Sequence, residues 1–83
     1  MNVTIHTSVT TGSVTATKVK YLQVINQHAS AAGTVNGASL AAGQTLTLPL
    51  LEGAKTYPDI VIDGTSSSLL INAVMEDAGA AVS

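Results

Sequence analysis

The chain has 83 residues, the size of one small domain, and its 3 basic and 5 acidic residues give a formal net charge of −2. So few basic groups cannot neutralise a run of phosphates, which argues against nucleic-acid binding. The absence of cysteine excludes disulfides, thiol catalysis and cysteine-ligated zinc.

The apolar residues are almost entirely aliphatic. The chain has no Phe and no Trp, and its only aromatic residues are Tyr21 and Tyr57. Because aromatic side chains bury the largest areas, the predicted core is thin, and the two tyrosines are expected to fill gaps in it. Only 10% of the residues are charged, against about 25% in ordinary soluble domains. A small domain without disulfides or a metal commonly gains stability from partners, so association is expected.

The first half of the chain is predicted to begin with two strand segments. Apolar and polar residues alternate over 3–9, the pattern of a half-buried strand. A longer run covers 14–26, but its apolar residues change phase near Tyr21. Either both faces of this strand are covered, or a bulge near Tyr21 shifts the register. Both interpretations make it a central strand.

A hairpin and an edge strand are expected next. The Asn36-Gly37 pair within 34–40 is a strong signal for a two-residue type I′ turn. A second turn follows at 41–44, and 45–50 alternates again, although Pro49 favours an edge position or a strand end. Leu46, Leu48 and Leu50 are expected on one face of this strand, and Thr45 and Thr47 on the other.

The last third is predicted to hold an irregular loop at 51–58, a short strand at 59–63 and a final strand at 68–74 that is apolar on both faces. These patterns together predict an all-β fold. We expect a small antiparallel β-sandwich or partly open barrel of about six short strands. One domain is expected over residues 1–76, followed by a flexible or partner-docked C-terminal tail at 77–83.

No group of residues has the pattern of a catalytic, cofactor or metal site. Asp59 and Asp63 lie at opposite ends of one strand, and Asp63 before a glycine is typical of a turn. His6 and His28 have no acidic cluster beside them in the sequence. No serine lies in a G-x-S-x-G elbow, and no glycine loop suits a phosphate. We therefore expect no enzymatic activity, no cofactor and no metal.

Two further features concern location. No apolar run approaches the roughly 20 residues of a membrane span, and the first residues lack the charge and apolar pattern of a signal peptide. We expect no membrane association and synthesis in a cytoplasm. The sequon at Asn2 is then expected to be coincidental.

Two stretches, 33–49 and 57–71, carry a resemblance. They combine a Val-Asn-Gly hairpin, a glycine-bounded strand, a tyrosine, an aliphatic-Asp-x-Gly turn and a terminal Leu-Leu-Ile strand. This combination resembles small virion proteins of tailed bacteriophages. The resemblance implies a repeated virion component, such as a capsid decoration (cement) protein or a head or tail fitting. It implies no particular functional residues.

The leading hypothesis is therefore a non-enzymatic structural protein of a bacteriophage virion. It would form homo-oligomers and contact other virion proteins, such as the major capsid protein or tail and neck components, through strand edges and the tail. The alternative is a binding module that recognises a host-surface glycan or protein. Its first candidate surface is the loop 51–58, with Lys55 and Tyr57.

Overall fold

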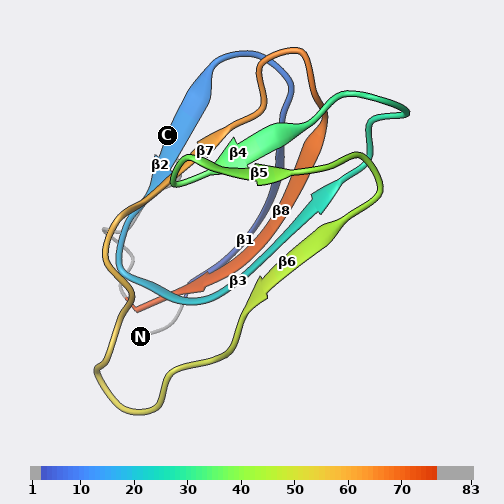
Figure 1. Cartoon of the computed structure of the whole chain (residues 1–83). Helices are drawn as coiled ribbons and strands as arrows, with labels where there is room; N and C mark the ends of the chain where they lie inside the picture. The colour runs from blue at the N-terminus through green and yellow to red at the C-terminus, as the bar shows by residue number, and fades with distance from the viewer. Residues whose placement is uncertain (1–2, 77–83) are drawn as a thin grey trace.

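The computed structural model describes residues 3–76, which contain no helix. These residues form eight strands (Figure 1): β1 Val3–Val9, β2 Ser13–Ala16, β3 Val19–Asn26, β4 Gly33–Val35, β5 Ala38–Leu40, β6 Thr45–Leu48, β7 Ile60–Asp63 and β8 Leu69–Met75.

The strands form two four-stranded antiparallel sheets. The first sheet has the order β1-β8-β3-β6, and the second has the order β2-β7-β4-β5. Figure 1 shows them as two layers, and they do not close into a barrel. The all-β prediction is confirmed, and of its two forms the structure is the sandwich. β1 and β6 are the edges of the first sheet, and β2 and β5 are the edges of the second.

The strand count exceeds the expected six because two predicted segments each give two strands. The hairpin at 34–40 contributes β4 and β5, and the run at 14–26 divides into β2 and β3. Between β2 and β3 the chain crosses from the second sheet to the first. Lys18 lies at this crossing with a positive φ of 53°, a conformation that turns the backbone sharply.

A β-bulge explains the change of phase in this run. Val19 pairs with Met75, whereas Tyr21 pairs with the next residue of β8, Val74, so that Lys20 is the extra residue. The bulge is one of the two alternatives that the sequence left open. As expected, β3 is an interior strand, with β8 on one side and β6 on the other.

The Asn36-Gly37 hairpin is confirmed. Both residues have positive φ, 50° and 81°, and Val35 pairs with Ala38 across the two-residue loop, as a type I′ turn requires. The side-chain oxygen of Asn36 also accepts a hydrogen bond from the Val61 amide at 2.7 Å. The hairpin is thereby attached to β7.

The predicted strand at 45–50 is shorter than expected. β6 is an edge strand that ends at Leu48, directly before Pro49, so the inference from proline is confirmed. Leu46 and Leu48 pack against the core. The prediction that Leu50 shares a strand face with Leu46 and Leu48 is wrong: β6 ends at Leu48, and Leu50 is 60% exposed.

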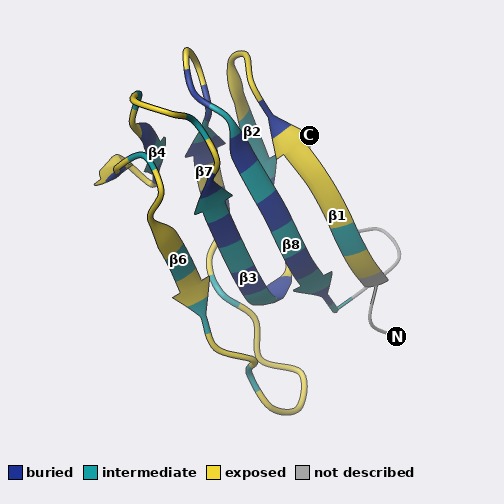
Figure 2. Cartoon of the chain, turned by 90° about the vertical axis from the view of Figure 1, so that its right-hand side faces the viewer, coloured by how far each residue is buried: buried dark blue, intermediate teal, exposed yellow. Residues whose placement is uncertain are grey.

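The core between the sheets is aliphatic, as the composition predicts. Tyr57 is the aromatic side chain packed against it. Figure 2 shows burial concentrated on β3, β8 and β7, whereas β1 is largely exposed. The buried apolar residues are Val9, Ala16, Val19, Leu22, Val24, Val35, Leu40, Ile60, Ile62, Leu69, Ile71, Ala73 and Met75.

One polar side chain, Asn26 at the end of β3, lies inside this core and is only 1% exposed. Its amide nitrogen donates to the carbonyls of Ala31 and Leu40, each at 2.9 Å. Its amide oxygen accepts from the His28 amide at 2.9 Å and from the Ser67 hydroxyl at 3.3 Å. One side chain therefore joins the loop after β3, the end of β5 and the turn before β8.

We expect Asn26→Ala to lower the free energy of unfolding by about 3 kcal/mol, because it leaves buried carbonyls without donors. Urea unfolding measures this loss. The matched control is Asn72→Ala, which removes the same amide from the half-buried outer face of β8 and should cost less than about 1 kcal/mol. Equal losses for the two variants would contradict the role assigned to Asn26.

Gly64 gives a second prediction, since a Cβ at this position would lie 2.4 Å from the carbonyl oxygen of Val9. Gly64→Ala must push two backbone segments apart, and we expect it to cost about 3 kcal/mol or more. Gly12→Ala is the control, because Gly12 has a positive φ but open space around it, and strain alone costs about 1–2 kcal/mol. Thermal unfolding of both variants should give this order.

Candidate functional site

The side chains that could take part in catalysis or metal binding do not lie close together in the fold. Among residues 3–76 there is no group of three or more His, Cys, Asp or Glu side chains that could hold a metal ion. No pocket is found in the part of the chain that the structure describes.

The two histidines lie in separate environments. His6 is exposed on β1, where its Nδ1 contacts the side-chain oxygen of Asn72 on the neighbouring strand. His28 lies in the loop after β3, where its Nδ1 accepts hydrogen bonds from the backbone amides of Ser30 and Ala31 at 3.1 and 2.9 Å. His28 thus has a structural role in its loop, and His6 is part of a polar row described below.

The acidic residues are equally dispersed, and Asp63 is confirmed as a turn residue. Its carboxylate accepts a hydrogen bond from the Thr65 amide at 2.9 Å. This backbone bond, with a further one from the Thr65 side chain, holds the pKa of Asp63 below its ordinary value. Asp59 precedes the strand that Asp63 ends. The sequon at Asn2 and the predicted tail 77–83 fall outside the described residues.

The loop 51–58 is fixed to the sandwich through Tyr57. The Tyr57 ring packs against the core, and its hydroxyl donates to the Pro49 carbonyl at 2.6 Å. Its backbone amide donates to the Val19 carbonyl at 2.7 Å. This supports the expectation that Tyr57 fills a gap, because its ring and its hydroxyl are both used within the fold. The same expectation for Tyr21 is wrong, because Tyr21 is half-buried on the outer face of the first sheet, opposite Val74.

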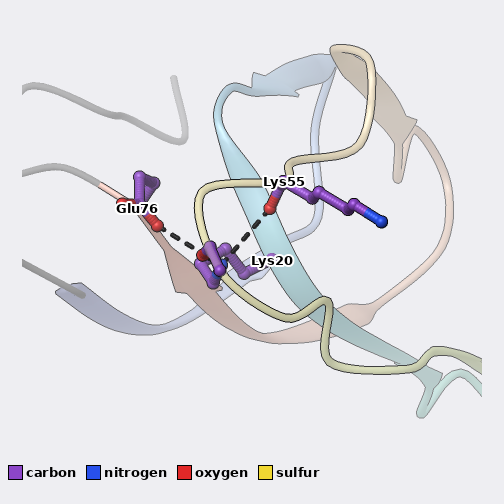
Figure 3. A network of polar contacts seen from close by, with 4 residues as sticks. Lys20, Lys55 and Glu76 are labelled. Carbon is purple, nitrogen blue, oxygen red and sulfur yellow. Dashed lines mark hydrogen bonds and ion pairs between the residues drawn. The ribbon is translucent and has the colours of Figure 1, made fainter.

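A buried lysine holds the same loop from the other side. Lys20, the bulge residue, is only 4% exposed. Its ammonium donates to the Gly53 carbonyl and, at 3.3 Å, to the Lys55 carbonyl, and it lies 3.4 Å from the Glu76 carboxylate. Figure 3 shows Lys20 between Glu76 and the loop, with the Lys55 side chain directed away. These partners offset the cost of burying a charge.

The Lys20 contacts were not anticipated from the sequence. The sequence did contain a sign that Lys20 is buried. Lys20 is the only charged residue of β3, and it lies directly before Tyr21, where the apolar residues change phase. A bulge places its extra residue toward the same side as its neighbour, so the lysine at that point becomes buried beside Val19.

The outer face of the first sheet carries a regular pattern of side chains. Cross-strand pairing aligns one polar row across all four strands: His6, Asn72, Gln23 and Thr47. Within this row Asn72 donates to Gln23 at 3.2 Å. Half-buried apolar side chains lie on either side of the row: Tyr21 and Val74 on one side, Ile25 and Leu70 on the other.

The sheet edges share one property. The four edge strands β1, β6, β2 and β5 contain no Asp, Glu, Lys or Arg. Inward-pointing or edge charges, above all lysine, are a common protection against pairing with other chains. β6 is followed by Pro49, and β2 and β5 are short, whereas β1 has seven residues and a continuous register with β8. The strand edges are therefore the candidate interaction sites.

The Lys20 contacts give a testable prediction. Lys20→Met keeps the length of the side chain but removes the donors to the loop, so the loop should open more often. We expect hydrogen exchange at the Leu51 and Tyr57 amides, which donate to Lys20 and Val19 carbonyls, to become roughly tenfold faster, since bonds to a charged group are worth about 1.5–3 kcal/mol. Lys55→Met should leave both rates unchanged.

The residues described contain no helix that is long and apolar enough to span a bilayer. The chain matches no protein-family model, no curated protein and no solved structure.

Proposed function

We propose that this protein is a non-enzymatic structural subunit of a tailed-bacteriophage virion, assembling in many copies as a capsid decoration (cement) protein or as a head or tail component. The observation that carries the proposal is the absence of charge from all four edge strands. A strand edge presents unpaired backbone donors and acceptors, and pairing with another chain satisfies them.

The outer face of the first sheet adds a second surface. It carries half-buried Tyr21, Ile25, Leu70 and Val74 on either side of the polar row. Within the row, His6, Asn72 and Gln23 already bond one another. Another subunit can cover this face without burying an ionised side chain, because the outward-facing residues of its strands include no Asp, Glu, Lys or Arg. Contacts of this kind suit a subunit with fixed neighbours.

The resemblance of 33–49 and 57–71 to small phage virion proteins gives the proposal its biological setting. The partners would be further copies of the chain and other virion proteins, such as the major capsid protein or tail and neck components. The protein would be made in the host cytoplasm and then reside in the virion. The alternative, a glycan- or protein-binding loop at 51–58, has less to build on, because the Tyr57 ring and hydroxyl are already used within the fold.

Two measurements test the proposal. Sedimentation velocity over a range of concentrations should show oligomers, because uncharged edges favour pairing between chains. In tailed particles purified from infected host cells, the chain should sediment with the particles in many copies, as quantified by mass spectrometry. A protein that remains monomeric at the highest concentration and is missing from purified particles would contradict the proposal.

A further inference from the structure

The outer edge of β1 differs from the other three edges in length and regularity. β1 has seven residues, whereas β6, β2 and β5 have four, four and three. All seven pair with β8 without a register shift, so no bulge bends the edge away from a partner. Within residues 3–76, no strand pairs with the other side of β1, and Figure 2 shows it at the margin of the sheet.

The chemistry of β1 fits a second copy of itself. Two identical strands that pair antiparallel in one sheet are related by a two-fold axis perpendicular to it, so each face continues into the same face of the partner. Pairing over the whole strand, Val3–Val9, fixes the register, because Val3 must then lie opposite Val9 of the second copy. His6, the central residue, then lies opposite His6 of the second copy.

The remaining pairs in this register are compatible. On the outer face, Thr4 lies opposite Ser8 of the second copy, and hydroxyl pairs of this kind stabilise sheets. On the inner face, Ile5 lies opposite Thr7 of the second copy. Ile5 is only half buried and Thr7 is exposed in the single chain, so pairing covers apolar surface that the sandwich leaves uncovered. No pair brings two formal charges together while His6 is neutral.

We propose that the chain forms a two-fold symmetric homodimer through β1, giving one continuous eight-stranded sheet with His6 at the axis, and that protonation of His6 weakens this dimer. The inference rests on the proposed function, for which it names the first assembly contact and its regulation. Its partner is a second copy of this chain.

The residues around His6 include no group that would compensate a positive charge on its ring. On the face that His6 shares, β8 presents Leu70, Asn72 and Val74, and β3 presents Tyr21, Gln23 and Ile25. Tyr21 is the only titratable side chain among these six residues, and none of the six is Asp, Glu, Lys, Arg or His. No carboxylate on these strands compensates for a charge at His6. Histidine changes its charge between about pH 5 and 8, and two like charges placed opposite each other destabilise a strand pair.

Cysteine variants test the register, because the chain has no cysteine of its own. In the proposed dimer, residue 4 lies opposite residue 8 of the second copy, with Cβ atoms about 4.5–5.5 Å apart. Two copies of residue 4 are four residues apart along the strands, roughly 13 Å. Mild oxidation of a mixture of Thr4→Cys and Ser8→Cys proteins should therefore give a mixed disulfide dimer, whereas either variant alone should not. His6→Cys should form a dimer by itself.

Charge variants test the regulation. The dimer dissociation constant, measured by sedimentation, should rise at least about fivefold between pH 8 and pH 5 for the natural chain. His6→Gln should remove this pH dependence. His6→Lys should weaken the dimer at both pH values, whereas Thr47→Lys, which adds the same charge to β6 at the other end of the same polar row, should leave it intact.

The outcomes separate this inference from the proposed function. Oligomers without the mixed Thr4–Ser8 disulfide would overturn the β1 dimer and leave the structural role in place through another edge. A disulfide with a dissociation constant that does not change with pH would overturn the role of His6 alone. A pH-sensitive β1 dimer in a protein that is missing from purified particles would instead overturn the proposed function.

Discussion

The amide of Asn26 is the contact on which one end of this sandwich depends. Hydrophobic burial in an aliphatic core is non-directional, so hydrogen bonds are needed to fix the conformation of the loops at that end. Asn26 provides it from β3, an interior strand of the first sheet, and reaches the end of β5 in the second sheet. All the hydrogen-bonding capacity of its side chain is used, which is the condition for a buried polar group to be stabilising.

Lys20 plays the corresponding part at the other end of β3. The same strand thus carries one buried polar side chain at each end, and both bond mainly to backbone carbonyls of irregular segments. The strands themselves are placed by aliphatic packing and ladder hydrogen bonds. Asn26 holds the loop after β3, and Lys20 and Tyr57 hold the loop 51–58.

The sequence predicted what local patterns determine. Alternation predicted β1 and β6, and a segment apolar on both faces predicted β8. The Asn36-Gly37 pair predicted the hairpin, and Pro49 predicted the end of an edge strand. It could not predict which strands become neighbours, because β1 pairs with β8 from the far end of the described chain. It also could not show that Asn26 and Lys20 are buried, since their partners come from distant loops.

The same limits apply to the candidate site. Residue types and spacing gave no catalytic pattern. The polar row across the first sheet could not be predicted from the sequence, because its four members come from four different strands. The prediction that Leu50 shares a strand face with Leu46 and Leu48 was wrong, because alternation alone does not show that the strand ends before Pro49.

The pairing of β1 with β8 has a consequence for how the protein is made. β1 is the first of the eight strands to leave the ribosome, and β8, the strand it pairs with, is the last. Until β8 emerges, β1 has no neighbouring strand on either side, so the first sheet can close only after the other seven strands have been made. Folding that waits for such distant pairing is slow, and the uncharged β1 is then open on both edges to other nascent chains.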